Sequence, residues 1–311
     1  MSGEKIAILA TGGTIAGTSP VPGDNLGYTA AQLRVEDLLA SVPALAGRPM
    51  VAEQVAQLDS KDMSFEVWRD LAQRCSHWLA HNDIAGLVIT HGTDTLEETA
   101  FFLHSVLATA KPVVLTCAMR PATALAPDGP QNLADAVAVA STTGARGVVA
   151  VCAGTIHAAR DVAKQHTYRL DAFGSGDAGP IGYVEEGRLR LLRDWPAAVA
   201  NADARLRQFI ACKRWPRVEI VISHAGASGE VVRALADGGV EGIVVAGSGN
   251  GSVHRELEAA LCRAVDSGVK VLRTTRCAQG EVLARPRDAL PHAPGLSPVK
   301  ARVELMLTLL D

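Results

Sequence analysis

Short runs rich in β-branched residues recur along this chain, and most of them are separated by segments with helical periodicity. The first part of the chain holds four such runs, at 5–10, 86–90, 112–117 and 147–152. The second part holds three, at 218–222, 242–246 and 269–273. Strand and helix patterns that alternate in this way predict an α/β fold with mainly parallel sheets.

Two of the intervening segments repeat apolar residues at about 3.6-residue spacing, which places these residues on one helical face. The first face combines Phe65, Trp68, Leu71, Ala72, Cys75 and Leu79. The second combines Leu96, Ala100, Leu103 and Leu107. Both segments are therefore predicted to be helices that pack against a sheet.

The length of the chain, 311 residues, exceeds what one hydrophobic core usually organises and predicts two domains. The stretch 189–214 lacks strand patterning, contains Pro196 and separates the two groups of runs. We therefore expect a larger N-terminal α/β domain over 1–188, which holds the catalytic motifs described below. An inter-domain connection over 189–214 and a smaller C-terminal α/β domain over 215–311 complete the expected organisation.

Charge and hydropathy exclude two classes of partner. Lys and Arg number 30 against 33 Asp and Glu, and no basic cluster carries interleaved aromatic residues, so nucleic acid is not expected as a partner. No apolar run approaches the roughly 18 residues of a membrane span, so a membrane is not expected either. The first residues hold too few consecutive apolar side chains for a signal-peptide core, which predicts a cytoplasmic protein.

Neither cysteine nor histidine spacing points to a metal site. The six cysteines are scattered without a C-x-x-C pair, which predicts reduced and mostly buried thiols. His77 and His81 stand four residues apart on a predicted helix, but Trp78 occupies the position where a zinc protease carries its glutamate. A solvated helix end is therefore preferred to a metal site, and no metal or organic cofactor is expected.

Polar clusters follow three of the predicted strands. TGGT at 11–14 follows the first strand, HGTD at 91–94 follows the second, and GSGNG at 247–251 follows a strand of the second domain. Ligands of parallel sheets bind at the carboxyl ends of the strands. These clusters are therefore candidates for a binding or catalytic site.

The first two clusters also have structural interpretations. The segment 11–17 suits a tight turn, and no Gly-Lys-Ser/Thr or G-x-G-x-x-G pattern completes a phosphate-binding loop. In the second cluster, Thr95 and Glu98 fit a capping box, which predicts a helix that starts at Thr95. Thr93 and Asp94 then remain on the loop at the end of the strand.

Six motifs of the chain resemble those of the L-asparaginase family and occur in the family's order over nearly the whole chain. They are TGGTIAG at 11–17, THGTDTLEETAFFL at 90–103, AMRP at 118–121, DGPQNL at 128–133, RDVAK at 160–164 and GSGNG at 247–251. TGGTIAG together with HGTDT is highly specific, whereas either motif alone is moderately so.

The resemblance implies that Thr14 is the nucleophile and that Tyr28 assists it. Amide hydrolysis needs a hydroxyl made nucleophilic by a neighbouring base, together with donors that face the oxyanion. The segment 17–28 is rich in Gly and Pro and is expected to be a mobile lid that brings Tyr28 to the site when it closes.

Thr93, Asp94 and Lys164 match the family's second hydroxyl-centred group. A lone lysine is usually a solvated charge, but a desolvated lysine hydrogen-bonded to Thr93 could act as a base directly or through water. The motifs leave open which threonine attacks first.

The resemblance also implies how an amino-acid substrate is held. Asp94 matches the carboxylate that binds the substrate's α-ammonium, and Ser60 matches the hydroxyl that binds its α-carboxylate. Asn250 matches a residue that reaches the active site of a neighbouring subunit. A homo-oligomer, either a dimer or a tetramer, is therefore expected.

Two positions depart from the family pattern. Lys61 stands where glutamine is common in the well-studied asparaginases. We favour a role for Lys61 in binding the α-carboxylate beside Ser60, with two alternatives: repulsion of the α-ammonium, or a surface pair with Asp59 or Asp62. The second departure is that no clear match follows Val271 for the family's acidic residue that helps to hold the amino group; Glu281 is a candidate only.

The resemblance implies an L-asparaginase, an amidohydrolase that converts L-asparagine to L-aspartate and ammonia, with glutaminase activity as a minor addition. One alternative is the related amidotransferase subunit that releases ammonia, although that subunit carries an extra N-terminal domain and here the catalytic motif begins at residue 11. Another alternative is a module that binds an amino acid without turnover.

Overall fold

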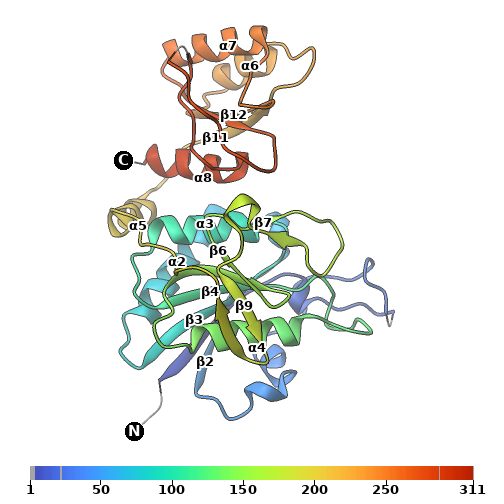
Figure 1. Ribbon diagram of the computed structural model, residues 1–311. Coiled ribbons are helices and arrows are strands. Elements are labelled where there is room, and N and C mark those ends of the chain that lie inside the picture. The colour runs from blue at the N-terminus through green and yellow to red at the C-terminus, as the bar shows by residue number, and fades with distance from the viewer. Residues whose placement is uncertain (1–3, 22, 287, 311) are drawn as a thin grey trace. The chain divides into compact units, whose positions relative to one another are not determined.

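The computed structural model describes residues 4–21, 23–286 and 288–310. The chain divides into two compact units, Met1–Leu206 and Arg207–Asp311 (Figure 1). Both units alternate strands and helices around mainly parallel sheets, which confirms the predicted α/β class with two domains. The division lies in helix α5 (Ala202–Ala211), within the stretch expected to connect the domains.

The first unit is built on an eight-stranded sheet with the strand order β10-β9-β6-β5-β4-β3-β1-β2. The β2–β1, β1–β3, β3–β4 and β4–β5 pairs are parallel, whereas the β5–β6, β6–β9 and β9–β10 pairs are antiparallel. The strands are β1 (Lys5–Gly12), β2 (Met50–Leu58), β3 (Ile84–Thr90), β4 (Pro112–Thr116), β5 (Gly147–Cys152), β6 (Thr155–Ala158), β9 (Gly182–Glu185) and β10 (Arg188–Leu191).

All four runs predicted as strands in this unit are strands, but the sheet contains others that the sequence pattern did not predict. Strand β2 lies at the edge, is only partly buried and carries Glu53 in its middle, so it lacks a continuous apolar run. Strands β9 and β10 form a short hairpin whose turn residues, Glu186 and Gly187, have φ angles of 49° and 72°. Because β10 is short and mostly exposed, its pattern is weak, and the expectation of a strand-free stretch from 189 onward was wrong at its start.

Four helices cover the sheet: α1 (Val35–Ala40), α2 (Phe65–Leu79), α3 (Leu96–Val106) and α4 (Gly129–Ala140). Helix α4 lies on one side of the sheet, and α2 and α3 lie on the other (Figure 1). Helices α2 and α3 meet where Trp68, on the predicted face of α2, stacks its ring on that of Phe102, which lies outside the predicted face of α3; the ring centroids are 4.7 Å apart. Strand β1 is buried along nearly its whole length, as a central parallel strand requires.

Several very short elements carry residues of the candidate site. Strands β7 (Ala163–Lys164) and β8 (Phe173–Gly174) form a two-stranded antiparallel sheet. Single turns of 3-10 helix occur at Thr14–Ala16, Pro43–Leu45, Ser60–Asp62 and Gly176–Ala178. Thr14, Ser60 and Lys164 thus lie at the ends of strands or in turns rather than inside long elements.

The second unit contains a three-stranded parallel sheet in the order β11-β12-β13. Its elements are β11 (Val218–Ile222), α6 (Glu230–Asp237), β12 (Gly242–Gly247), α7 (Arg255–Asp266), β13 (Lys270–Thr275) and α8 (Pro298–Thr308). All three strands predicted here are confirmed. Helices α6 and α7 lie on one side of the strands and α8 lies on the other (Figure 1).

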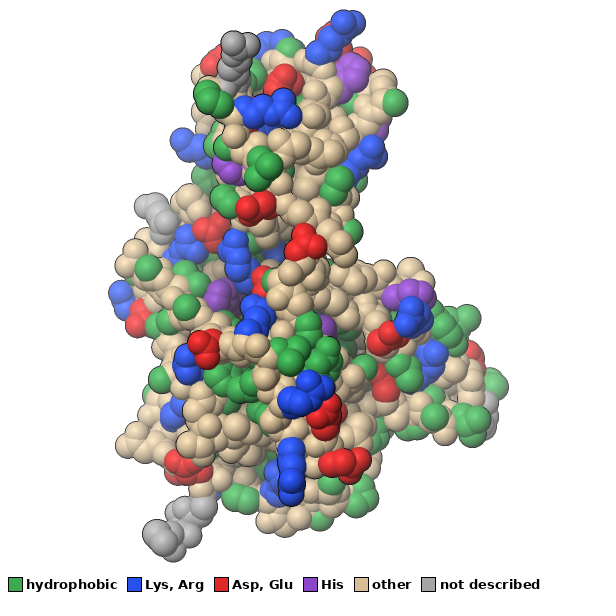
Figure 2. Space-filling view, in the orientation of Figure 1, with side chains coloured by type: hydrophobic (Ala, Val, Ile, Leu, Met, Phe, Trp, Pro, Cys, Tyr) green, Lys and Arg blue, Asp and Glu red, His purple; other side chains and the backbone are tan. Residues whose placement is uncertain are grey.

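Surface and side-chain features bear on the expected partners. On the face shown in Figure 2, acidic and basic side chains are interspersed. Within the described residues, no helix is both long enough and apolar enough to cross a membrane. All six cysteines are free thiols, and Cys75, Cys117 and Cys152 are buried. His77 and His81 contact each other through their rings, 4.8 Å apart, and no group of three metal-ligating side chains occurs in the described part of the chain.

Candidate active site

Three loops meet at the carboxyl end of the first unit's sheet because glycines allow their backbones to touch. Gly12 and Gly13 have φ angles of 104° and 83°, which favour glycine. A side chain on Gly13 would overlap the backbone of Gly92. A β-carbon on Gly92 would in turn lie 2.5 Å from the Ser60 Oγ. The two predicted threonine motifs and the turn at Ser60 are therefore brought together, and the glycines are a condition of that contact.

Thr14 and Tyr28 are brought together as predicted. The Thr14 Oγ1 lies 2.7 Å from the Tyr28 hydroxyl, and either oxygen can donate the hydrogen bond. Thr14 is buried, with 7% of its surface exposed. The Tyr28 ring lies against Gly17, where an added β-carbon would stand 2.8 Å from a ring carbon. A glycine at 17 is thus needed for Tyr28 to reach Thr14.

The segment 17–28 is tied down at its base. Thr18 and Thr29 pair through two backbone hydrogen bonds of 2.9 and 2.8 Å. The Ser19 N–H donates to the Thr123 hydroxyl at 2.9 Å, which joins this segment to the loop between β4 and α4. Pro22 lies outside the described residues. The interpretation of this segment as a lid stays a prediction.

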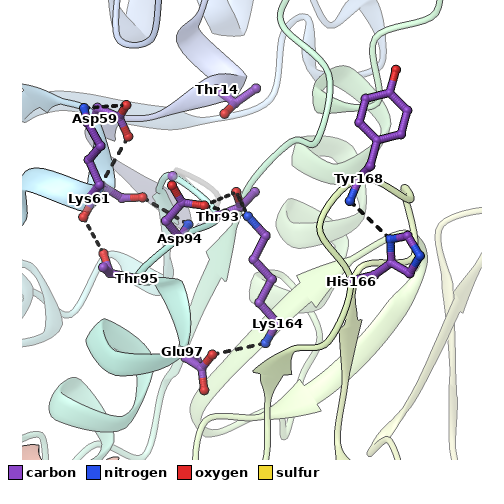
Figure 3. Close-up of polar contacts among 12 residues, drawn as sticks. Thr14, Asp59, Lys61, Thr93, Asp94, Thr95, Glu97, Lys164, His166 and Tyr168 are labelled. Carbon is purple, nitrogen blue, oxygen red and sulfur yellow. Dashed lines mark hydrogen bonds and ion pairs between the residues drawn. The ribbon is translucent and has the colours of Figure 1, made fainter. Parts of the chain in front are cut away.

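Thr93, Asp94 and Lys164 form the second cluster, although Lys164 is about 70 residues away in the sequence. The Lys164 ammonium donates to Thr93 Oγ1 at 2.8 Å and to Asp94 Oδ1 at 2.6 Å. Figure 3 shows the Lys164 side chain extended toward both partners. Thr93 is buried, whereas the Asp94 carboxylate remains half exposed. The cluster therefore has an acidic group that an amino-acid ligand can reach.

Ser60 is locked to the loop that carries Thr93. Its Oγ accepts a hydrogen bond from the Asp94 N–H at 3.1 Å, and its carbonyl accepts one from the Thr95 hydroxyl at 2.8 Å. Thr95 does occupy the N-cap position of α3, but its side chain makes no capping bond. The predicted capping box is therefore wrong, because the Thr95 hydroxyl is used to hold the Ser60 turn instead.

Lys61 lies next to Ser60 but its ammonium is held at the surface. It donates to Asp59 Oδ2 (Figure 3) and to Asp62 Oδ2, at 2.9 and 3.0 Å, and 61% of the side chain is exposed. These two bonds, first that to Asp59, raise the pKa of Lys61 above its ordinary value. The geometry corresponds to the surface pair that the sequence left as an alternative, not to the favoured contact with a substrate carboxylate.

His91 is part of the site's support, and the sequence analysis assigned it no role. Its ring is fully buried, and desolvation lowers its pKa from 6.5 to about 4, so the ring is neutral. The Nδ1 lies 2.8 Å from the Gly92 carbonyl, to which it donates in the neutral form. The signal in the sequence was its position inside the motif at 90–103, directly before Gly92.

Asp128 explains the two motifs that had no assigned role. Its carboxylate accepts the backbone N–H groups of Met119 and Arg120, both at 2.9 Å. The Arg120 guanidinium lies over the Tyr168 ring, 4.0 Å from its centroid. AMRP and DGPQNL thus form one loop structure, which contacts the segment that follows Lys164.

Asn250 belongs to the second unit and is not among the residues that the first unit brings together. It lies in the loop after β12, where its amide donates to the Leu283 carbonyl at 3.0 Å and accepts from the Leu283 N–H at 2.8 Å. This double contact holds the loop that also carries the exposed Glu281. The two candidates of the second unit are therefore neighbours in one loop structure.

Known proteins match the chain in both units. The family model described as Asparaginase, N-terminal, matches residues 5–197, and the Glutaminase/Asparaginase C-terminal domain matches residues 217–311. The glutaminase-asparaginase of Pseudomonas fluorescens biotype A is 39% identical over 314 residues, which cover 98% of this chain and 86% of that protein. The L-asparaginase 2 of Escherichia coli K12 is 39% identical over 316 residues, which cover 98% and 88%.

Among solved structures, one titled "Crystal Structure of Probable Cytoplasmic L-asparaginase from Campylobacter jejuni" is similar over almost the whole chain. It has a TM-score of 0.92 and 38% identity, with 99% of this chain and 95% of that chain covered. The matches extend over both units, and their ranges contain the positions of all six motifs given above. The chain belongs to the asparaginase family.

Proposed function

We propose that this chain is an L-asparaginase that hydrolyses L-asparagine to L-aspartate and ammonia, with Thr14 as the nucleophile. The observation that carries the proposal is the pair of hydroxyl centres at one sheet edge, Thr14 with Tyr28 and Thr93 with Lys164 and Asp94. Relatives named L-asparaginase 2 and glutaminase-asparaginase support the substrate class. Glutaminase activity is proposed as a minor addition.

In the first step, Thr14 attacks the side-chain amide carbon of the substrate. A threonine hydroxyl is a weak nucleophile at neutral pH and needs a proton acceptor in contact with it. The Tyr28 oxygen, 2.7 Å away, takes this proton while its own hydroxyl proton passes to the amide nitrogen. The C–N bond then breaks, ammonia leaves, and the acyl group remains on Thr14 as an ester. Water cleaves the ester, which releases aspartate and restores the Thr14 hydroxyl.

Thr93 supplies a second polar group to the same carbonyl. The Lys164 ammonium donates to Thr93 Oγ1, and the Thr93 hydroxyl in turn donates to Asp94 Oδ1 over a long distance of 3.4 Å. When substrate is bound, this proton can turn from Asp94 to the developing oxyanion. In its neutral form Lys164 can instead accept the Thr93 proton while the Thr93 oxygen takes a proton from the water that cleaves the ester. Both functions need the Lys164 nitrogen within hydrogen-bond distance of Thr93.

The free amino-acid end of the substrate is proposed to bind at Ser60 and Asp94. The half-exposed Asp94 carboxylate suits an α-ammonium. Ser60 Oγ accepts the Asp94 N–H, and its own proton can donate to an α-carboxylate. For Lys61 we propose a surface role through Asp59 and Asp62.

Ammonia release by the purified protein tests the proposal, with L-asparagine, L-glutamine and buffer compared in parallel. Thr14→Ala is expected to abolish turnover, by about three or more orders of magnitude, because it removes the nucleophile. Its fold should survive, since Thr14 lies on a turn and its hydroxyl's partner, Tyr28, comes from the lid. Retention of a tenth of the wild-type kcat would remove Thr14 from the role. Binding of L-asparagine by the wild type without any ammonia would instead indicate a binding module.

Assembly and location are proposals as well. We propose a homo-oligomer in which Asn250 completes the site of a neighbouring subunit, and a cytoplasmic location. Light scattering tests the homo-oligomer, because a fully active monomer would exclude it. Relatives differ in their location. The Campylobacter jejuni structure is titled that of a probable cytoplasmic L-asparaginase, whereas the relative from Haemophilus influenzae is named a probable periplasmic one. Fractionation of cells that express the full-length gene decides between them.

A further inference from the structure

Lys164 is held at both ends by one short segment of the chain. Its ammonium contacts Thr93 and Asp94, and its backbone N–H donates to Glu97 Oε1 at 3.2 Å (Figure 3). Glu97 lies in the first turn of α3, three residues after Asp94. The segment 93–97 therefore binds the start and the tip of the same lysine side chain.

The Lys164 N–H lies on the side of its strand that does not face β8. Lys164 belongs to β7, one of only two strands in its small sheet. The next N–H along, that of Gln165, donates to the Ala172 carbonyl at 2.7 Å, toward β8. Successive N–H groups of a strand point in opposite directions, so the Lys164 N–H points away from β8. Glu97 therefore accepts the N–H of Lys164, which points away from the small sheet.

We propose that Glu97 is a positioning residue for the proposed amide hydrolysis: its carboxylate fixes the Lys164 backbone so that the ammonium reaches Thr93. In this role Glu97 acts on the Lys164 backbone rather than on the substrate. It acts by setting where the Lys164 side chain starts. The inference rests on the proposed function, in which the Lys164 to Thr93 contact is needed for turnover.

A plain structural function of Glu97 predicts something different. An acidic residue in the first turn stabilises any helix through the helix dipole. Glu66 occupies the same position in α2, two residues after the N-cap, as Glu97 does in α3. Glu66→Ala therefore serves as a matched control that removes an acidic helix start far in sequence from Lys164.

The test compares Glu97→Ala and Glu97→Gln with Glu66→Ala in the full-length chain. Glutamine keeps an acceptor oxygen for the Lys164 N–H, and alanine removes it. A displacement of about 1 Å at a reacting group can cost on the order of 100-fold in rate, so we expect Glu97→Ala to lower kcat by about 10- to 100-fold. Its KM should stay within about twofold, because the substrate contacts of Ser60 remain. Glu97→Gln should retain most of the wild-type kcat, and Glu66→Ala all of it.

Two kinetic results would overturn the inference: a kcat for Glu97→Ala within twofold of the wild type, or equal losses in the alanine and glutamine variants. Thermal unfolding of all three variants shows whether a loss of kcat is only a loss of fold. Amide hydrogen exchange at Lys164 gives a readout that does not need activity. Exchange there should be faster in Glu97→Ala than in the wild type and in Glu97→Gln, and equal rates would also overturn the inference. If the wild type releases no ammonia, the proposed function fails. The exchange result still decides whether Glu97 holds the Lys164 backbone.

Discussion

The buried ring of His91 makes the stability of the first unit depend on pH. Desolvation lowers its pKa from 6.5 to about 4. In the unfolded chain the ring takes up a proton as the pH falls through 6.5, whereas in the folded protein it stays neutral until about pH 4. Between these values the unfolded state binds more protons than the folded state. The stability associated with the neutral His91 is therefore fully present above pH 6.5 and is lost as the pH falls toward 4.

The size of the effect follows from the shift. Each pKa unit corresponds to about 1.4 kcal/mol, so the change from 6.5 to about 4 costs about 3 kcal/mol once the pH reaches 4. That is a large share of the roughly 5 to 15 kcal/mol by which folded proteins are stable. The neutral ring also donates to the Gly92 carbonyl, so its protonation would disturb the contact between the two threonine loops.

Urea unfolding of the wild type and of His91→Gln across this pH range tests the prediction. Glutamine does not titrate, so the difference in unfolding free energy between the two proteins should change by about 2.5 kcal/mol between pH 7.5 and 4.5. His224→Gln is the control, because the exposed His224 ring makes the same kind of contact, Nδ1 to the Ala225 carbonyl at 2.9 Å. Parallel stability curves for wild type and His91→Gln would refute the argument.

Three further predictions concern the proposed site. Tyr28→Phe keeps the ring that packs on Gly17 but removes the hydroxyl near Thr14, so kcat should fall by about 100-fold with little change in KM. Steady-state kinetics with L-asparagine measure both constants. An unchanged kcat would show that Tyr28 takes no part in proton transfer. Hydrogen exchange over residues 17–28 should slow when L-aspartate is bound, and equal exchange with and without it would argue against a lid. Lys61→Gln should change the KM for L-asparagine by less than about twofold, because exposed pairs contribute little. A tenfold rise in KM would restore the carboxylate role of Lys61.

The apolar strands and the two amphipathic helices could be predicted from the sequence because their burial is visible as periodicity. Edge strand β2 and hairpin β9–β10 could not, since β2 is only partly buried and the hairpin strands are short, with β10 mostly exposed, so none of them has a continuous apolar run. The capping box failed for a related reason. A Thr95 hydroxyl can donate to any nearby carbonyl, and only the folded chain brings that of Ser60 within 2.8 Å.

The candidate site shows the same division between local and long-range information. The motifs identified Thr14 and Thr93, and the structure brings each together with the partner that the family resemblance implied. The orientation of Lys61 was open from sequence, because a carboxylate stands close to it on either side, Asp59 and Asp62, and several pairings have similar energy. The tether from Glu97 to Lys164 joins residues 67 apart, and no sequence pattern indicates it.

The sheet sets the positions of Thr14 and Thr93, whereas hydrogen bonds set the positions of their partners, Tyr28 and Lys164. Strands β1 and β3 are neighbours in register, with Ala10 opposite Thr90, so the loops that follow them leave the sheet at the same level. Thr14 and Thr93 follow at similar distances along these loops, and the contact between their glycines fixes the remaining separation. Lys164 and Tyr28 come instead from a two-residue strand and from the segment 17–28, and their segments are held by a few hydrogen bonds. Substitutions in β1, in β3 or at the glycines that position the two threonines should therefore lower the free energy of unfolding first. Substitutions that remove the hydrogen bonds holding Lys164 or Tyr28 should lower kcat while the unfolding temperature stays nearly constant.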